Sequence, residues 1–324
     1  MEKKPKVFVA GRMPNEVVTF LQEHCEISRW DSSDPLPSEV LFREIAEVEG
    51  FLTSGTRIDN TLLEAAPRLK VVSNMAVGYN NFDIPAMKQR NVIGTNTPYV
   101  LDDTVADLIM ALMLSVARRI PELDKLVKEG RWVKGDQTPL FGLDVHHAKL
   151  GIVGMGRIGE AVARRAKLGF SMDVSYYNRT RKTDTEREIG VRYEPLHTLL
   201  AEADFVLLMT PLTSETTRFF GAQQFRLMKR TAFFINASRG QTVCEDELIQ
   251  ALQEGWIRGA GLDVFEKEPV DPTNPLLKMA NVVTVPHIGS ATAQTRFDMA
   301  MRAANNLVVG LSGHTPIDII PELK

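Results

Sequence analysis

The sequence predicts an α/β protein with two doubly wound parallel sheets. Apolar runs alternate with helical patterns over the first 100 residues and again from Lys149 onward, and such alternation is typical of parallel sheets. Between Lys149 and Arg181, two apolar runs enclose a glycine-rich turn and an amphipathic segment. A chain of 324 residues is long enough for two domains with sizeable cores.

The first region contains three predicted strands and two predicted helices. The strands are Lys6–Ala10, Gly50–Thr53 and Lys70–Asn74, and the helices are Asn15–His24 and Asp59–Ala66. The loops after the second and third strands, residues 54–56 and 76–80, lie at carboxyl ends of strands, where open α/β sheets bind ligands. Backbone N–H groups near Val77 and Gly78 could hold a carboxylate there. The alternative is an ordinary tight turn, and spacing alone does not choose between the two.

A long helix and a loop-rich segment lead into the second region. Residues Asp102–Arg119 place apolar side chains on most of the helix surface, which favours burial in a core, with an interdomain or dimer contact as the alternative. Residues 131–147 contain Trp132, Pro139 and Phe141, and we expect them to pack on something outside their own domain.

The second region has the strand count of a full doubly wound sheet. The predicted strands are Leu150–Val153, Val174–Tyr177, Ala203–Met209, Thr231–Asn236, Gly259–Val264 and Asn281–Val285. The predicted helices between them are Pro195–Ala201, Gly221–Met228 and Glu245–Glu254. A final helix, Ala291–Leu311, is expected to cross back and rejoin the first domain, making that domain discontinuous.

Composition argues against several classes of protein. The net charge of −3 gives no reason to expect a nucleic acid or an anionic membrane as partner. Two cysteines are too few for a disulfide framework or a cysteine zinc cluster, and we expect no metal site. No apolar stretch approaches the roughly 20 residues that span a bilayer. The N-terminal segment beginning at Met1 and Glu2 lacks the apolar core of a signal peptide, so we expect a cytoplasmic protein.

The glycine-rich turn predicts a dinucleotide site. Gly154, Gly156 and Gly159 follow an apolar run and open a helical pattern, in the spacing GxGxxG. The first glycine allows the tight turn, the second lets the backbone approach a pyrophosphate, and the third lets the helix pack close to the strand. Free N–H groups at the helix start would hold the phosphates.

The residues after the second apolar run bear on which dinucleotide binds. About 20 positions after the last glycine, an acidic side chain would bind the ribose 2′-OH of NAD, whereas an arginine would accommodate the 2′-phosphate of NADP. This chain has Asn178 there, followed by Arg179, Thr180, Arg181 and Lys182. Because a guanidinium can bind phosphate through two parallel hydrogen bonds, we expect NADP to be preferred and NAD to be the less favoured cofactor. The alternative is a solvated basic turn.

Three chemically active side chains follow three successive predicted strands. Arg239, Glu268 and His287 would therefore gather at the sheet edge that carries the glycine turn. That set suits hydride transfer between a nicotinamide and a 2-keto acid. Arg239 would bind the substrate carboxylate and polarise the keto oxygen, and His287 would donate the proton as the alcohol forms. Glu268 would orient the imidazole and favour its charged form. Taken singly, each residue could instead be a surface ion pair or a core histidine.

These motifs resemble those of the D-isomer-specific 2-hydroxyacid dehydrogenases, in the glyoxylate/hydroxypyruvate/2-ketogluconate reductase branch. The resemblance covers nearly all of the chain, in Ser73–Asp83, Thr104–Asp107, the glycine turn, Asn236–Gly240, Asp263–Pro269 and Pro286–Thr292. It implies NADPH-dependent reduction of glyoxylate, hydroxypyruvate and 2-ketogluconate to D-2-hydroxy acids. It also implies a Rossmann cofactor domain over residues 102–289 and a flavodoxin-like substrate domain over residues 1–101 and 290–324.

The resemblance further implies particular contacts. The substrate would meet Arg239, His287, the amides of Val77 and Gly78, and the loop near Ser54. The cofactor would meet Thr104, Gly154, Gly156, Arg157, Ile158, Gly159, Asn178, Arg179, Thr180, Arg181, Thr210, Pro211, Ala237, Ser238, Asp263 and Gly289. A homodimer would be built on residues near 102–147, with Trp132 reaching the partner's active site.

The sequence differs from the family pattern at two places, and two alternative functions stay open. Asn178 stands where NAD-using members have an acidic residue, which supports NADP, and Thr210-Pro211 differs from some members. A formate or phosphite dehydrogenase could use the same fold with another role for the histidine. A dinucleotide-sensing, corepressor-like binding protein could also use it, although a sensor need not keep Arg239, Glu268 and His287 together.

Overall fold

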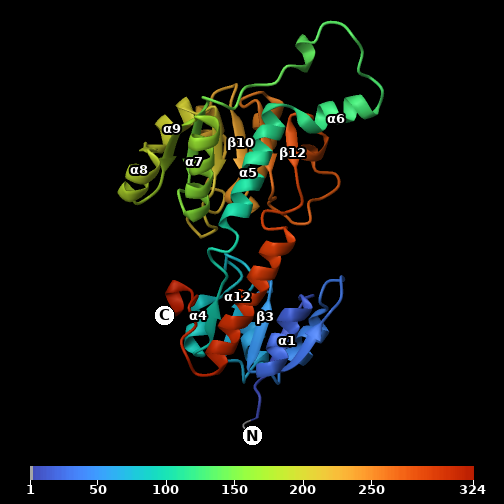
Figure 1. Cartoon of the computed structure of the whole chain (residues 1–324), viewed down its shortest axis with the longest axis vertical. Coiled ribbons are helices and arrows are strands. Elements are labelled where there is room, and N and C mark those ends of the chain that lie inside the picture. The colour runs from blue at the N-terminus through green and yellow to red at the C-terminus, as the bar shows by residue number, and fades with distance from the viewer. Residues whose placement is uncertain (1–2) are drawn as a thin grey trace. The chain divides into compact units, whose positions relative to one another are not determined.

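The chain divides into two compact units, each with its own parallel sheet (Figure 1). This computed structural model describes residues 3–324, so Met1 and Glu2, with the expectation drawn from them, lie outside the described residues. One unit joins Met1–Leu101 to Ala291–Lys324, and the other is Asp102–Ser290.

The first unit is a five-stranded parallel sheet in the order β2-β1-β3-β4-β5. Its strands are β1 Lys6–Ala10, β2 Glu26–Trp30, β3 Gly50–Thr53, β4 Val71–Asn74 and β5 Ile93–Thr95. Its helices are α1 Asn15–His24, α2 Ser38–Ile45, α3 Asn60–Ala65, α4 Ile84–Gln89 and α12 Ala293–Leu311. This strand order is the flavodoxin-like one, as expected.

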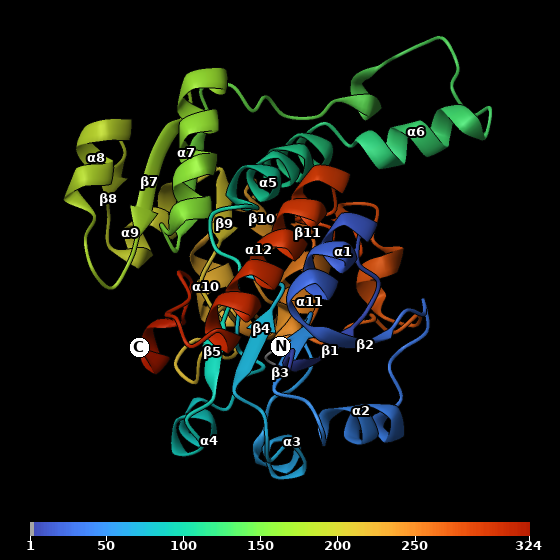
Figure 2. The same cartoon turned by 60° about the horizontal axis from the view of Figure 1, so that its bottom comes forward.

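Helices cover both faces of the first sheet because alternate residues of each strand point to opposite faces. On one face, Val7 and Leu52 pack with residues of α1 and α12, including Leu21 and Leu307. On the other face, Phe8, Phe51 and Val72 pack with residues of α2, α3 and α4. Figure 2 shows α12 and α1 side by side on their face of the sheet, with α2, α3 and α4 opposite.

The second unit is a seven-stranded parallel sheet in the order β12-β11-β10-β9-β6-β7-β8. Its strands are β6 Lys149–Val153, β7 Asp173–Tyr177, β8 Arg192–Tyr193, β9 Phe205–Leu208, β10 Phe233–Asn236, β11 Gly259–Leu262 and β12 Val282–Thr284. Its helices are α5 Asp102–Ala117, α6 Ile120–Lys128, α7 Arg157–Phe170, α8 Thr183–Ile189, α9 Leu196–Glu202, α10 Ala222–Leu227 and α11 Glu245–Gln253. The order reverses between β6 and β9, which is the switch point of a Rossmann sheet.

Two helical layers also enclose the second sheet. On one face, Leu199 of α9, Phe225 of α10 and Leu248 of α11 share a buried cluster with strand residues such as Val206 and Phe234. On the other face lie α5 and α7 (Figure 1). There α5 passes so close to β11 that a Cβ on Gly261 would lie 3.2 Å from Cβ of Leu112. Packing of α5 in the core, the favoured interpretation of its sequence, is confirmed by eight buried residues along it.

The predicted α/β fold class is confirmed. Three strands of the two sheets were not predicted. β2, β5 and β8 lie at the edges of the two sheets. β2 reads Glu-Ile-Ser-Arg-Trp without a buried residue, and β5 and β8 have only three and two residues. Edge strands are half solvated and short, so they carry no apolar run for a sequence pattern to detect. Helices α2, α4, α6 and α8 were not predicted either.

Candidate active site

The three candidate catalytic residues follow adjacent strands of the second sheet. Arg239 comes after β10, Glu268 after β11 and His287 after β12, and these strands pair in that order. The loops after them leave from one edge because the strands are parallel. Within that edge, Nδ1 of His287 lies 2.7 Å from Oε2 of Glu268.

The carboxylate of Glu268 is fixed at both oxygens. Oε1 accepts the N–H of Phe265 at 3.0 Å, and Oε2 meets His287. Burial alone would raise the pKa of Glu268. The hydrogen bonds from His287 and Phe265, with the charges of His287 and Arg239, outweigh burial and hold that pKa below 4.5. Glu268 is therefore an anion at neutral pH.

Arg239 is a largely buried cation. Nη1 donates to the carbonyl of Ser238 at 2.7 Å. Burial lowers the pKa of Arg239 from its ordinary value, and the charge of Glu268 opposes that shift. A guanidinium titrates so far above neutrality that it stays charged. The loop that carries it is shaped by Asn236, whose Oδ1 accepts from the N–H and hydroxyl of Ser238 at 3.0 and 2.8 Å.

The loop that carries His287 is anchored by Asp263. The backbone of His287 has φ +50°, an uncommon conformation for a residue with a side chain. Its N–H donates to the carbonyl of Asp263 at 2.9 Å, and the Asp263 carboxylate accepts from Ile288 N (2.6 Å) and Gly289 N (3.0 Å). Burial raises the pKa of Asp263, against the lowering effect of those bonds. Asp263, expected to contact the cofactor, thus has both oxygens occupied by this loop.

Glu245 holds the connection that carries Glu268, a role that the sequence did not reveal. Its Oε2 accepts the N–H of Glu266 at 2.9 Å, and its Oε1 accepts from Nδ2 of Asn274 at 2.7 Å. The loop after β11 also packs closely against Gly240, where a Cβ would lie 1.8 Å from the backbone of Phe265. An acidic residue at a helix start is a common feature, so no sequence signal singled out Glu245.

The glycine turn has the geometry that its three glycines predict. Gly154 has φ +106°, and a Cβ there would lie 2.7 Å from the backbone of Met209. A Cβ on Gly159 would lie 3.0 Å from the carbonyl of Gly154, so this glycine lets α7 pack against the turn. At Gly156, the N-cap of α7, a Cβ would meet nothing within 4 Å. That open space borders the N–H groups of the first helical turn, including those of Arg157 and Ile158.

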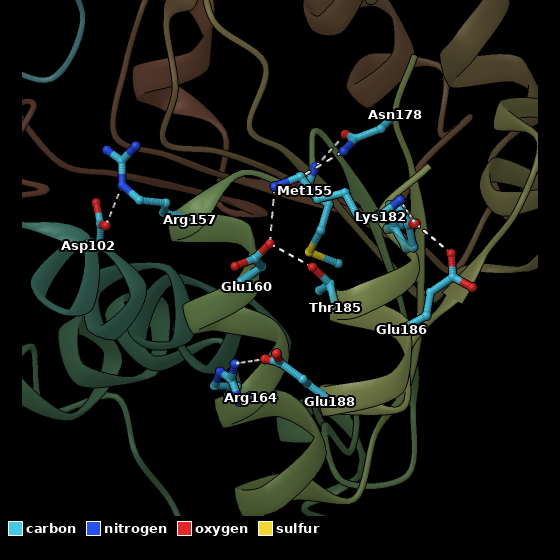
Figure 3. A network of polar contacts seen from close by, with 11 residues as sticks. Asp102, Met155, Arg157, Glu160, Arg164, Asn178, Lys182, Thr185, Glu186 and Glu188 are labelled. Carbon is cyan, nitrogen blue, oxygen red and sulfur yellow. Dashed lines mark hydrogen bonds and ion pairs between the residues drawn. The ribbon is translucent and has the colours of Figure 1, made fainter. Parts of the chain in front are cut away.

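Side chains brace the turn from both sides (Figure 3). Asn178, after β7, accepts the N–H of Met155 at 2.7 Å and donates to its carbonyl at 3.1 Å. Arg157 donates from Nε to Oδ2 of Asp102 at 2.8 Å, tying the start of α7 to the start of α5. Asp102 was not predicted as a site residue. Asn178 is thus a brace for the glycine turn, a role that its replacement of an acidic residue did not suggest.

The basic residues after Asn178 differ in how firmly they are held. Arg181 makes two bonds to Glu186 at 2.8 and 2.7 Å, and Glu186 also accepts from the hydroxyl of Tyr176. Hydrogen bonds from Arg181 and Tyr176 lower the pKa of Glu186 to about 2. Lys182 pairs with Glu160 of α7 at 3.2 Å (Figure 3).

Arg179 is held more loosely than the other two cations. Its partner is Glu215, at 2.5 Å, and the two side chains are 80% and 69% exposed. Exposed pairs of this kind contribute little free energy. Arg179 is therefore the cation of this turn that could leave its partner and bind a phosphate with the smallest loss of free energy. Thr180, the next residue, is also exposed.

The remaining predicted cofactor residues lie on the same unit. Thr210 and Pro211 follow β9, and Thr210 has a buried Oγ1 without a hydrogen-bond partner among the described residues. Ala237 and Ser238 follow β10, Gly289 follows His287, and Thr104 lies in the first turn of α5. The open space at Gly156 and the orphaned hydroxyl of Thr210 fit a dinucleotide at the switch point.

The predicted substrate loops belong to the first unit. Ser54 is exposed after β3, and Val77 and Gly78 are partly exposed after β4. Neither N–H of the latter pair donates a hydrogen bond within residues 3–324. Amides of this kind could bind a carboxylate.

Over residues 3–324, no group of three or more His, Cys, Asp or Glu is placed to hold a metal ion. No helix in that part of the chain combines the length and apolar character needed to cross a bilayer.

Comparison with known proteins gives the family. Residues 110–289 match the model of the D-isomer specific 2-hydroxyacid dehydrogenase, NAD binding domain. Glyoxylate/hydroxypyruvate reductase B of Escherichia coli (strain SMS-3-5 / SECEC) is 48% identical over 310 residues, which is 96% of each chain.

Solved structures agree with that match. The TT0316 protein from Thermus thermophilus aligns with a TM-score of 0.90 at 39% identity, over 97% of this chain and 99% of its own. The NADPH-dependent glyoxylate/hydroxypyruvate reductase SMc04462 from Sinorhizobium meliloti, in complex with NADP and malonate, aligns with a TM-score of 0.87 at 32% identity, over 99% and 98%.

The fold, the site and these matches define an oxidoreductase with a nicotinamide dinucleotide as cofactor. The chain belongs to the D-isomer specific 2-hydroxyacid dehydrogenase family.

Proposed function

We propose that this protein reduces small 2-keto acids, glyoxylate and hydroxypyruvate foremost and 2-ketogluconate as a further substrate, to D-2-hydroxy acids with NADPH. The observation that carries the proposal is the His287–Glu268 pair, 2.7 Å apart, on a loop edge shared with Arg239. The 48% identical relative is named a glyoxylate/hydroxypyruvate reductase, which supports the substrate class. On this proposal the second unit is the cofactor domain and the first, discontinuous unit is the substrate domain.

The roles follow from the charges. A bound NADPH supplies the hydride that reduces the keto carbon. Arg239 binds the substrate carboxylate and polarises the keto oxygen, because a guanidinium offers two parallel donors to a carboxylate. His287 donates the proton to the keto oxygen as the alcohol forms. Glu268 keeps the imidazole oriented and charged, and the amides of Val77 and Gly78 bind the substrate carboxylate from the first unit.

NADPH is preferred over NADH because the turn after β7 offers cations and no carboxylate to the ribose. Asn178 occupies the position of an acidic residue and uses its amide on Met155. Arg179 is the cation whose partner is most easily displaced. The similar Sinorhizobium meliloti enzyme, described as NADPH-dependent, was crystallised with NADP. The other predicted cofactor contacts, from Thr104 to Gly289, are proposed because these residues lie on the same unit as the glycine turn.

We also infer a homodimer built on residues near 102–147 in a cytoplasmic enzyme. Helix α6 contains no buried residue, and the large apolar side chains of Ile120, Val127, Trp132, Val133 and Phe141 are all more than half exposed. Apolar exposure of this extent is typical of an interface. Sedimentation of the purified protein tests the dimer, and a Trp132→Ala dimer with unchanged kcat and KM would remove Trp132 from the partner's site.

The direct test of function is the oxidation of NADPH, followed by absorbance, with glyoxylate, hydroxypyruvate and 2-ketogluconate in turn. We expect turnover with at least one of them and a lower KM for NADPH than for NADH. Turnover with formate or phosphite and NADP instead would favour the rival dehydrogenase. Dinucleotide binding without turnover of any of these acids would favour a sensor.

A further inference from the structure

Three consecutive peptide groups in the loop after β4 have their carbonyls held and their N–H groups unused. The carbonyl of Ala76 accepts from Thr97 N at 2.9 Å, that of Val77 from Asn96 Nδ2 at 2.8 Å, and that of Gly78 from Asn74 Nδ2 at 2.9 Å. Within residues 3–324, the N–H groups of Val77, Gly78 and Tyr79 donate no hydrogen bond.

Fixing a carbonyl fixes the N–H of the next residue. A trans peptide is planar, with its C=O and N–H pointing in opposite directions. The bond from Asn96 to Val77 therefore directs the N–H of Gly78 away from Asn96. In the same way, the bond from Asn74 to Gly78 directs the N–H of Tyr79. Successive N–H groups that lie free in one loop form a concavity that binds anions.

The two asparagines are built into the sheet rather than lying on its surface. Asn74 is fully buried at the carboxyl end of β4, and Asn96, just after β5, is 9% exposed. Their orientation is unambiguous, because a carbonyl only accepts a hydrogen bond and the side-chain NH₂ is the group that donates. Asn74 also accepts the N–H of Gly55 at 3.0 Å with Oδ1, so it links the loop after β4 to the loop after β3.

Asn96 is in turn held by the C-terminal segment. Its N–H donates to the carbonyl of Asp318 at 3.2 Å. The carboxylate of Asp318 accepts two bonds from Arg302 of α12, at 2.7 and 2.8 Å. Asn96 thus connects the segment that contains the buried carboxylate of Asp318 to the carbonyl of Val77, which gives that peptide little freedom to rotate.

We propose that Asn74 and Asn96 are positioning residues for the substrate, and that the N–H of Tyr79 is a third donor beside those of Val77 and Gly78. The ligand class is a carboxylate, and the inference rests on the proposed function, in which this loop receives the substrate carboxylate. Neither asparagine touches the ligand. Each acts by turning one peptide so that its N–H points at the anion.

The test uses isosteric variants of the full chain. Asn74→Asp and Asn96→Asp replace a donor by a carboxylate that repels the carbonyl it should hold. Because a buried carboxylate at position 74 costs folding free energy, Asn74→Ala is made beside it and the Tm of each variant is recorded. Asn81→Asp is the matched control, since its Nδ2 donates to Thr56 O and holds none of the three carbonyls.

We expect Asn74→Asp, Asn74→Ala and Asn96→Asp to raise KM for glyoxylate by about tenfold or more, the loss expected when a bond to a charged group is misaimed. We expect kcat to fall by a smaller factor and the Kd for NADPH to stay within about twofold, since the dinucleotide binds the other unit. A measurement that does not depend on turnover is the rate of hydrogen exchange of the backbone N–H groups of residues 77–79 in the NADPH complex. Oxalate should slow this exchange in the wild type and not in the variants.

The outcomes separate the inference from the proposed function. Wild-type turnover of glyoxylate with an unchanged KM in all three variants overturns the positioning role while leaving the function standing. A tenfold effect in Asn81→Asp as well would also overturn it, because the effect would then be general to the loops. If the wild type turns over no 2-keto acid but oxalate still protects amides 77–79, the function falls and the anion site stands.

Discussion

One carboxylate joins the loop after β11 to the loop after β12: Glu268 accepts Phe265 N–H with Oε1 and lies 2.7 Å from Nδ1 of His287 with Oε2. Both oxygens are therefore occupied, and the imidazole keeps Nε2 as the nitrogen that Glu268 does not bind. The pair sets the tautomer as well as the orientation of the ring.

Removal of the imidazole tests the proton path. We expect His287→Ala to lower kcat for glyoxylate reduction by about 10²-fold or more, the contribution of a general acid. The Kd for NADPH, measured by nicotinamide fluorescence, should change little. A wild-type kcat in this variant would take His287 out of the reaction.

Glu268→Gln should move the pH profile of reduction. The amide cannot stabilise a charged imidazole as the carboxylate does, so the fall of kcat/KM at high pH should begin at lower pH than in the wild type. A Glu268→Gln profile that superimposes on that of the wild type, at any amplitude, would contradict the electrostatic role of Glu268.

The same pair makes stability depend on pH, with a definite sign. The pKa of Glu268 lies below 4.5 in the folded protein, so its contribution is present above pH 4.5 and is lost as the pH falls through the lower folded value. We expect the Tm of the wild type to exceed that of Glu268→Gln near pH 6. The margin should shrink below pH 4.5, and thermal melts at stepped pH measure it. A margin that grows toward acid would show the opposite shift.

Arg179 and Arg181 should respond differently to removal. Arg179→Ala should raise KM for NADPH by about tenfold or more, since a charge-assisted phosphate contact is lost, and leave KM for NADH nearly unchanged. Glu215→Gln removes the carboxylate that competes for Arg179, so it should lower KM for NADPH by a small factor. Arg181→Ala should act mainly on Tm through Glu186. Equal losses with both dinucleotides in Arg179→Ala would refute the phosphate contact.

Sequence patterns predicted the strands and turns whose structure is determined by residues close together in the chain. A buried parallel strand such as β9 reads as an apolar run, and the turn after β6 needs glycine at Gly154 for its positive φ. The placement of Arg239, Glu268 and His287 on one edge followed from parallel topology alone, because every loop after a parallel strand leaves from the same edge.

Contacts between distant loops could not be predicted from the same patterns. Glu245 accepts hydrogen bonds from Glu266 and Asn274 at the sheet edge, and Asp102 accepts one from Arg157 between two helices. Those partners are set by how far each loop extends in three dimensions, for which spacing along the chain carries no signal. Asn178 illustrates the limit, since its sequence position indicated the cofactor but not its bonds to Met155.

The aromatic cluster under β10 predicts a large loss of stability on truncation. Phe234 is fully buried, with ring centroids 4.8 Å from Phe220 and 5.3 Å from Phe225. Phe234→Ala should destabilise the protein by about 3–5 kcal/mol, the range for such cavities, and thermal unfolding measures it. Leu168→Ala, at a position of α7 that is 86% exposed and outside the proposed dimer segment, is the control and should leave Tm nearly unchanged. Equal effects at the two sites would mean that the cluster does not support the sheet.

Glu245 gives the sharpest test of whether the loop after β11 must be held for catalysis. Its two oxygens bind Glu266 N–H and Asn274 Nδ2, on either side of Glu268. Glu245→Ala leaves that N–H without its acceptor, so Glu268 loses its fixed position beside His287. We expect kcat to fall by about tenfold, since small misplacements of catalytic groups are costly, with the pH profile displaced as in Glu268→Gln and the Kd for NADPH unchanged. Asp246→Ala is the matched control, because Asp246 is an exposed acidic residue in the same first turn of α11. An equal loss in Asp246→Ala, or a wild-type pH profile in Glu245→Ala, would reduce Glu245 to a general stabiliser of the helix start.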